Sequence, residues 1–431
     1  MMENKLAIVG GSKVINYEFK KYNSIGKEEL EAATDVIKTG VLSQFLGCHS
    51  EDFLGGPKVK EFEESCKDYF GVDYAITVNS WTSGLVAAIG ALDINPGDEI
   101  IVPPWTMCAS ATAILHWNAI PVFADIDEKT FNIDPQSVIK NISKRTKAIL
   151  SVDIFGHSAD MESLRAIADE YDLKLISDTA QSPGAVYKGK IAGTLADIGG
   201  YSLNYHKHIH TGEGGILVTN DPNLAERMQL IRNHAEAAVE GMKINNIANM
   251  LGHNFRLGEI ECAMGIEQLK KLDYFVKTRQ VAAKKLILGL SELEGIRLPV
   301  TLDDCSHVYY MLPMVLDIEK LGVSRDKIFK ALEAEGVQGL AQGYANIHML
   351  PMYQNKIAYG SSGFPWNSEF CDRDVSYAKG ICPIAEKLHD ETFLAYEMCL
   401  HDLRDNDINQ IIGAFEKVWD NLEVLSSAYI D

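Results

Sequence analysis

The chain has 431 residues, of which 46% are hydrophobic and 23% charged, a composition typical of a globular protein with a substantial core. Its formal net charge of −20 argues against nucleic acid or an anionic membrane as a partner, because either would need a basic face. Eight scattered cysteines without CxxC or metal-ligand spacing predict free thiols in a reducing cytoplasm and no metal site, and no apolar run is long enough for a signal peptide or a membrane span.

Helical and extended patterns alternate along the first half of the chain. We expect helices at 27–39, 58–70, 84–92, 105–115, 135–141 and 159–171, and strands at 74–78, 99–103, 120–125, 148–153 and 173–177. This alternation predicts an α/β fold with a mostly parallel sheet and helices on both faces. The polar stretch 44–56 is expected to be a surface loop, the alternative being a lid over a substrate mouth.

A strand, a polar turn and a helix follow one another at 74–92. The turn is expected at Asn79–Ser83, directly before the helix. A helix N-terminus offers free N–H groups and the positive end of a dipole, so this arrangement suits a phosphate group. An ordinary capped helix explains the same spacing equally well.

Asp178 follows the strand expected at 173–177 and opens the sequence Asp178-Thr179-Ala180-Gln181. Ligands of parallel sheets bind at the carboxyl ends of the strands, where this carboxylate is placed. Taken alone, an aspartate after a strand is more often a turn or cap residue.

Lys207 lies on a tight connection between strands expected at 198–203 and 216–218. A free lysine amine has a pKa of about 10.4 and must lose its proton before it can attack an aldehyde, which burial or a nearby cation favours. The neighbours His206 and His208 are not expected to touch the amine, because adjacent residues of an extended segment point to opposite faces. The ordinary alternative is a solvated surface amine.

The second half of the chain predicts a smaller α+β domain. We expect helices at 224–233, 259–272, 277–290, 325–335 and 408–427, and a strand at 308–316. The expected division is a large domain, including an N-terminal arm, at 1–275 and a small domain at 276–431.

Several of these motifs together carry a resemblance to a known family. Ser202, Lys207 and Thr211-Gly212-Glu213-Gly214-Gly215 resemble the Schiff-base lysine segment of the DegT/DnrJ/EryC1/StrS aminotransferases, which are pyridoxal-phosphate enzymes of fold type I, with an aspartate-aminotransferase-like large domain. The resemblance extends over about residues 20–430. It implies that Lys207 binds the cofactor and moves the substrate proton, and that Asp178 serves the pyridine nitrogen.

The resemblance also implies the remaining cofactor contacts. Gln181 would approach the phenolic oxygen of the ring, while Ser202, Thr82 and Ser83 would hold the phosphate. Asn254, in the segment Gly252-His253-Asn254-Phe255-Arg256, would reach the phosphate of a neighbouring subunit. The expected assembly is therefore a homodimer with shared active sites.

Two positions depart from the family pattern. Trp81 stands where the family carries glycine and threatens to crowd the phosphate site. Met107 matches the position of the aromatic residue that stacks on the ring, and Trp105 lies two residues away, so either residue is a candidate. His348 and the turn Cys382–Lys387 match family landmarks more loosely.

The expected activity is transfer of an amino group from glutamate or glutamine to a keto sugar, with a nucleotide-linked sugar as the first expectation, or to a similar polyol ketone. Family dehydratases, which replace the lysine by histidine, provide one alternative. A regulatory protein that keeps the fold without turnover provides the other, and Trp81 and Met107 are the residues that favour it.

Overall fold

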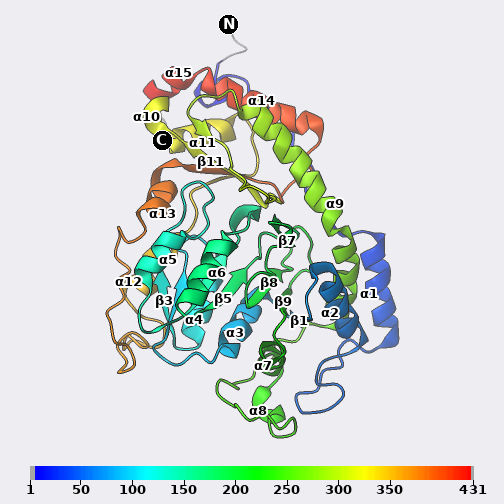
Figure 1. The fold of residues 1–431 in the computed structure, drawn as a ribbon. Helices are drawn as coiled ribbons and strands as arrows, with labels where there is room; N and C mark the ends of the chain where they lie inside the picture. Colours follow the sequence, from blue (N-terminus) through cyan, green and yellow to red (C-terminus); the bar gives the residue numbers. More distant parts are fainter. Residues whose placement is uncertain (1–4, 429–431) are drawn as a thin grey trace.

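The computed structural model describes residues 5–428 of the chain, arranged as a large lobe below a smaller one in the view of Figure 1. A seven-stranded sheet with the order β1-β9-β8-β5-β4-β2-β3 forms the centre of the large lobe. Its strands are β1 (Tyr74–Val78), β2 (Glu99–Val102), β3 (Ile120–Phe123), β4 (Thr146–Val152), β5 (Lys174–Asp178), β8 (Ile198–Ser202) and β9 (Gly215–Thr219). The pairs from β8 to β3 are parallel and the two that involve β9 are antiparallel, so the predicted mostly parallel sheet is confirmed.

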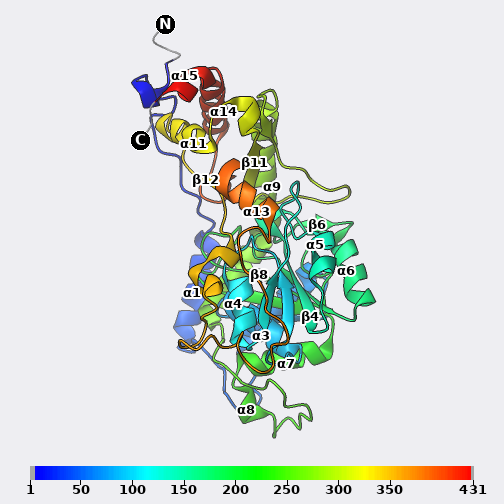
Figure 2. The ribbon, with the colours of Figure 1, turned by 90° about the vertical axis from the view of Figure 1, so that its left-hand side faces the viewer.

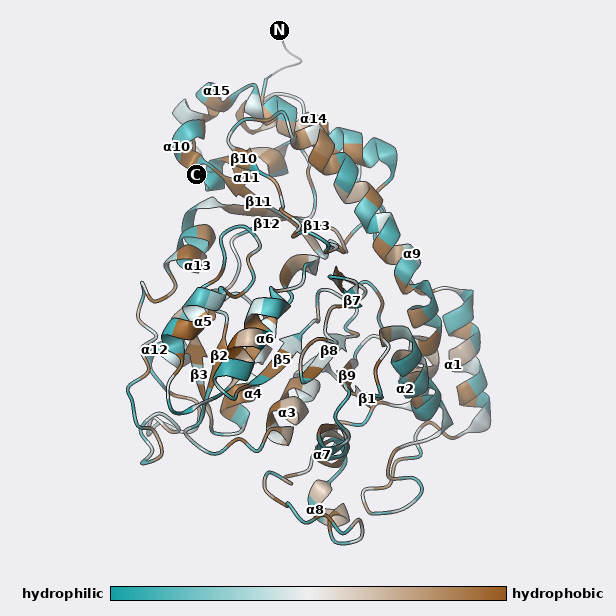
Figure 3. Ribbon diagram, in the orientation of Figure 1, coloured by the Kyte–Doolittle hydropathy of each residue, from teal (hydrophilic) through white to brown (hydrophobic). Residues whose placement is uncertain are grey.

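Helices cover both faces of this sheet, as predicted. The helices of the large lobe are α1 (Lys27–Thr39), α2 (Pro57–Phe70), α3 (Trp81–Ala91), α4 (Ala109–His116), α5 (Pro135–Asn141), α6 (Met161–Glu170), α7 (Pro222–Arg232) and α8 (Ala235–Ala238), of which α1 packs on the long helix described below and α8 on α7. Figure 2 shows α4 and α6 on opposite sides of the strands, as right-handed crossovers in opposite directions require. Strands covered on both faces need continuous apolar runs, and Figure 3 shows β2 and β3 as predominantly hydrophobic.

The small lobe is built on a four-stranded antiparallel sheet with the order β10-β11-β13-β12. Its elements are β10 (Ile296–Arg297), β11 (Met311–Leu316), α10 (Ile318–Leu321), α11 (Arg325–Ala334), β12 (Leu340–Gln342), β13 (Phe393–Glu397), α14 (Asp405–Trp419) and α15 (Leu422–Ser427). The short helices α12 (Pro351–Gln354) and α13 (Pro383–Lys387) lie in the segment between β12 and β13, and the hairpin β6 (Val186–Tyr187) and β7 (Lys190–Ile191) precedes β8.

The beginning of the chain packs into this small lobe and not against the sheet that follows it in sequence. Leu6, Ile15 and Phe19 belong to the same core cluster as α11 and α14. The Glu335 carboxylate accepts hydrogen bonds from the main-chain nitrogens of Ala7 (2.8 Å) and Val14 (3.1 Å). The core of the small lobe is therefore made from both ends of the chain.

The long helix α9 (Glu259–Leu290) corrects the prediction of two helices at 259–272 and 277–290. Leu272 packs in a core cluster of the large lobe, whereas Leu286 and Leu290 pack in the core of the small lobe. Because the buried face changes partner along the helix, its apolar pattern shifts, and this shift resembles a break in the sequence. The expected domain boundary between residues 275 and 276 falls inside α9 and stays a prediction.

Other element boundaries also differ from the predictions. Helix α3 begins at Trp81, because Ser80 caps it by accepting a hydrogen bond from the Ser83 nitrogen, so the expected turn is shorter. Helix α4 begins at Ala109 instead of residue 105, and β11 begins at Met311 instead of residue 308. The closing helix expected at 408–427 is divided into α14 and α15.

Three further expectations concern the cysteines, membrane-spanning helices and the stretch 44–56. All eight cysteines are unpaired, as predicted. Across residues 5–428, none of the helices combines the length and the apolar character needed to cross a membrane. The stretch 44–56 contains no helix or strand and is a loop, as expected.

Candidate active site

Lys207 lies on the connection between β8 and β9, as predicted, with its side chain directed inward. Only 7% of its surface is exposed, and its amine has no hydrogen-bond or ion-pair partner among the described residues. The Nζ atom lies 4.4 Å from the centre of the Tyr310 ring. Burial lowers the pKa of Lys207 to about 8, although the nearby Asp178 charge acts in the opposite direction. The surface alternative is therefore wrong.

Backbone hydrogen bonds close the loop between β8 and β9 that carries Lys207. The Leu203 nitrogen donates to the Gly214 carbonyl at 2.9 Å, and the Thr211 nitrogen donates to the Leu203 carbonyl at 3.1 Å. Gly212 has φ of 88°, a conformation that side chains rarely adopt. His208 points away from the amine, since its Nε2 atom lies 2.9 Å from the Val308 carbonyl.

Asp178 ends β5 and is 4% exposed. Its Oδ1 atom accepts hydrogen bonds from Trp81 Nε1 (2.7 Å) and the Ala180 nitrogen (3.2 Å), and its Oδ2 atom accepts one from Ser110 Oγ (2.8 Å). Burial raises the pKa of Asp178, while these donors and Lys207 act in the opposite direction. A carboxylate has about four lone-pair sites, so Oδ2 keeps one for a further N–H donor.

Trp81 does not fill the phosphate site. Its side chain is buried in the core of the large lobe, where it bonds to Asp178. Gly200 in β8 makes this possible, because a Cβ there would lie 2.1 Å from the Trp81 ring. Trp81 and Ser110 are thus hydrogen-bond partners of Asp178 that the sequence patterns did not predict. Gly200, in the middle of β8, is the signal in the sequence that indicates a bulky neighbour.

The residues expected to hold a phosphate gather at the N-terminus of α3. Ser83 Oγ bonds to Asn79 Oδ1 at 2.7 Å, Thr82 is exposed beside it, and Asn79 Nδ2 donates to the Asn254 carbonyl at 3.3 Å. Ser202 ends β8 and pairs with Gly215 of β9. Gly215 also pairs with Val78, the last residue of β1, which comes shortly before this helix. The structure therefore brings Thr82, Ser83, Ser202 and Asn254 to one edge of the sheet.

The Asn254 side chain is exposed, and its Oδ1 atom accepts a hydrogen bond from Arg256 Nε at 2.7 Å. Its amide nitrogen has no hydrogen-bond partner within the described residues. The side chain is thus available to a ligand of its own chain or of a neighbouring one.

The side chains of Gln181 and Trp105 both form hydrogen bonds within the protein. Gln181 Oε1 accepts a hydrogen bond from the Phe155 nitrogen at 2.8 Å, and its Nε2 atom donates to Tyr344 Oη at 3.1 Å. Trp105 is fully buried among aromatic rings and donates to Asn346 Oδ1 at 2.8 Å, so it cannot stack on a cofactor. Met107, 60% exposed, stays the candidate for that position.

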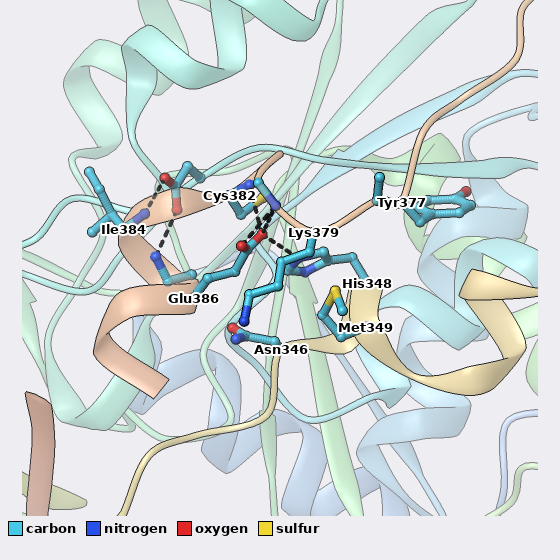
Figure 4. Close-up of polar contacts among 12 residues, drawn as sticks. Asn346, His348, Met349, Tyr377, Lys379, Cys382, Ile384 and Glu386 are labelled. Atoms are coloured by element: carbon cyan, nitrogen blue, oxygen red, sulfur yellow. Dashed lines mark hydrogen bonds and ion pairs between the residues drawn. The ribbon is translucent and has the colours of Figure 1, made fainter. Parts of the chain in front are cut away.

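The segment that carries Tyr344 is fixed against the large lobe by the polar network in Figure 4. His348 Nε2 lies 2.9 Å from Glu386 Oε1, and Glu386 also accepts backbone N–H groups of the turn before α13. Asp125, which follows β3, accepts the Ile384 nitrogen at 2.9 Å. The loosely matching landmarks at 348 and 382–387 therefore form one structural unit beside the site.

The comparisons with known proteins agree with this geometry. A model of the DegT/DnrJ/EryC1/StrS aminotransferase family matches residues 24–393. GDP-perosamine synthase of Caulobacter vibrioides is 36% identical over 69% of this chain and 79% of that protein. L-glutamine:scyllo-inosose aminotransferase of Streptomyces griseus is 30% identical over 99% of this chain and 100% of that protein.

The fold agrees as well. The X-ray structure of the aminotransferase from Psychrobacter cryohalolentis superposes with a TM-score of 0.80 at 27% identity, covering 94% of this chain and 100% of that one. A family model that covers most of the chain, together with a relative and a structural neighbour that are named as aminotransferases, identifies the reaction class. The chain belongs to the DegT/DnrJ/EryC1/StrS family and is an aminotransferase.

Proposed function

We propose that this aminotransferase uses pyridoxal phosphate to move an amino group from glutamate or glutamine to a keto sugar or similar polyol ketone. The observation that carries the proposal is the Lys207 amine, which is buried, unpaired and close to Asp178. An amine with a pKa of about 8 is partly neutral at physiological pH and can attack an aldehyde carbon.

The residues present fit the cofactor that the family implies. Asp178 Oδ2 has a free lone-pair site for a pyridine N–H group. The N-terminus of α3, with Thr82 and Ser83, suits a phosphate, and Ser202 lies at the same edge. Gln181, which is hydrogen-bonded to Tyr344, would place polar groups around the phenolic oxygen of the cofactor ring.

Pyridoxal phosphate, when bound, supplies a ring that takes up the electron pair released at the substrate carbon. Asp178, a buried carboxylate with donors on both oxygens, would keep the ring nitrogen protonated. The Lys207 amine would remove the proton at the substrate carbon and return one at the neighbouring position, since its lowered pKa suits both directions of transfer.

Two relatives support a sugar-like acceptor. One is named for GDP-perosamine and the other for scyllo-inosose, a cyclic polyol ketone, with L-glutamine as the donor in that name. The unpaired cysteines support a reducing compartment, and we propose the cytoplasm.

Borohydride reduction followed by peptide mapping tests the assignment of Lys207. We expect a pyridoxyl group on Lys207 and transfer of ¹⁵N from labelled glutamine or glutamate to a ketone acceptor. A pyridoxyl group on another lysine, with Lys207 unmodified, would falsify the assignment.

We further propose that the working unit is a homodimer whose sites are shared through Asn254. Exposed apolar side chains on the loops at 41–54 and 239–251 support an interface on that edge of the large lobe: Val41, Leu42, Leu46, Leu54, Ile247 and Leu251. The loop after α8 and the loop before α2 extend from the same end of the molecule in Figure 1. The exposed Asn254 side chain lies near that end, beside the N-terminus of α3.

Mixing Lys207→Ala chains with Asn254→Ala chains tests this sharing. A mixed dimer with shared sites has one site with both defects and one with neither, so activity should return to about a quarter of the wild-type value after random exchange. Mixed dimers confirmed by mass spectrometry that stay inactive would show that each chain builds its own site. Each variant mixed with itself serves as the control.

A further inference from the structure

A cavity of about 320 Å³ lies between the β8–β9 connection and the small lobe, lined in part by His206, the chain neighbour of Lys207. Tyr310, which lines it, has its ring 4.4 Å from Lys207 Nζ. The cavity falls within the range of about 300–1,000 Å³ that is usual for small-molecule sites. Its lining residues are Tyr205, His206, Tyr310, Glu397, Cys399 and Leu400.

Glu397 is the carboxylate of this cavity. It ends β13 and pairs with Met311 of β11, which places it next to Tyr310. Its side chain is half-buried, yet within residues 5–428 it has no hydrogen-bond or ion-pair partner, and burial raises its pKa. By contrast, the buried carboxylates Asp178 and Glu386 each accept several hydrogen bonds.

An unpaired carboxylate in a partly desolvated place costs free energy unless a ligand supplies donors. The carboxylate only accepts hydrogen bonds, and its bonds to hydroxyl groups are short and strong because the acceptor is charged. The structure leaves these acceptor sites open in a cavity that shares the Tyr310 ring with the Lys207 amine.

The cavity offers no positive charge of its own for an anionic ligand. No lysine or arginine is among its lining residues in the described chain, and burial lowers the pKa of His206 to about 4, so its imidazole is neutral at physiological pH. The guanidinium of Arg279, behind Cys399, donates to Cys399 Sγ at 3.2 Å and stacks on the Tyr22 ring. A phosphate directly beside Glu397 would therefore be repelled, and the carboxylate of the proposed amino donor would bind in a part of the site away from Glu397.

We propose that Glu397 determines the acceptor: its two carboxylate oxygens receive adjacent hydroxyl groups of an uncharged cyclic polyol ketone. The inference rests on the proposed function and narrows it, because it favours a free keto sugar or keto-cyclitol over a nucleotide-linked sugar. A site built around a hydroxyl discriminates strongly against analogues that lack it, since the buried acceptor is then left unpaired.

Equilibrium binding of myo-inositol, an unreactive cyclic polyol, tests the contact without turnover. The cofactor-loaded wild type should bind it, and Glu397→Ala should weaken binding by about tenfold to a hundredfold, with a smaller loss in Glu397→Gln, which keeps one acceptor oxygen. Glu416→Gln, on the exposed face of α14, is the matched control and should bind like the wild type. Cofactor absorbance and circular dichroism report whether each variant is folded and loaded.

Kinetics then compare acceptors. For a keto-inositol, kcat/KM should fall in Glu397→Ala as far as inositol binding does, and the wild type should prefer the keto-inositol to nucleotide-linked keto sugars. Unchanged inositol binding in a folded Glu397→Ala protein, or a wild-type preference for nucleotide-linked sugars, contradicts the role of Glu397. If the loaded wild type aminates no ketone at all, the proposed function fails instead, and inositol binding alone decides the role of Glu397.

Discussion

The two walls of the active site differ in how their polar groups are satisfied. On the wall formed by the large sheet, Asp178 and Gln181 already have protein donors or acceptors in place. On the wall formed by the small lobe, Glu397 faces a cavity without a partner. This difference fits the two proposals above, in which the first wall is preorganised for a permanently bound cofactor and the second is completed by the substrate.

The buried Lys207 amine on the sheet wall has no hydrogen-bond or ion-pair partner among the described residues, and its loss should have the largest effect. Lys207→Ala should lower turnover by at least about 10⁴-fold, because it removes both the cofactor attachment and the proton-transferring amine. Steady-state amino transfer measures the loss, and circular dichroism should show an intact fold. The exposed Lys190→Ala serves as control; comparable activity in both variants would remove Lys207 from the reaction.

Asp178→Asn should reduce turnover by about 10²- to 10³-fold while cofactor binding is retained. The amide has nearly the same shape, but it cannot stabilise a protonated ring nitrogen. Turnover at saturating substrates, together with cofactor titration, separates the two effects. Near-normal turnover in the variant would show that the sheet wall only positions the ring.

The buried amine of Lys207 should also destabilise the cofactor-free protein. The drop of its pKa from 10.5 to about 8 corresponds to about 3 kcal/mol, so at pH 7 Lys207→Met should be more stable than the wild type by up to that amount. The unfolded chain keeps the lysine proton up to about pH 10.5 and the folded chain releases it near pH 8, so the wild type gains stability over this window and the difference disappears above it.

Urea unfolding of the cofactor-free proteins at pH 7 and pH 10 measures this difference. Lys190→Met, at an exposed position, should show none at either pH. Equal stability of Lys207→Met and the wild type at pH 7 would mean that the amine is better solvated than its surroundings indicate.

Trp81→Phe should have the smallest effect, about threefold to tenfold in kcat. It removes one of three donors to Asp178 and keeps an aromatic ring against Gly200. The pKa of Asp178 should rise because a donor to its charged form is lost. A loss as large as that of Asp178→Asn would show that the indole N–H, and not the burial of the carboxylate, controls the sheet wall.

Local sequence patterns placed the key residues of the sheet wall beside the correct strands, but their roles were inferred from the family resemblance, and the contacts of Trp81 and Ser110 were not foreseen. Asp178 and Lys207 each stand next to a short apolar strand, and the parallel order of the strands brings their ends to one edge. Patterns failed where the outcome depends on distant packing. Trp105 was a candidate for stacking because its chain position is close to Met107, but rings from β13 and other segments enclose it.

The small-lobe wall was beyond sequence reasoning for a related reason. Tyr310 and Glu397 are far apart in the chain, and only the pairing of β11 with β13 makes them neighbours. The same limit applies to α9. Its first part packs in a core of the large lobe and its last part in the core of the small lobe, so its apolar pattern is not uniform along the helix. The alternation of strands and helices, by contrast, depends on local spacing and was predicted correctly.

The N-terminal segment that packs into the small lobe has a consequence for synthesis on the ribosome. Domains generally fold as units, beginning with the N-terminal one. Here Leu6, Ile15 and Phe19 must wait until α11 and α14 have emerged, more than 300 residues later. Until then these apolar side chains are exposed on the nascent chain, where they form a natural binding segment for a chaperone. These first residues can therefore join their core only after the end of the chain has been made.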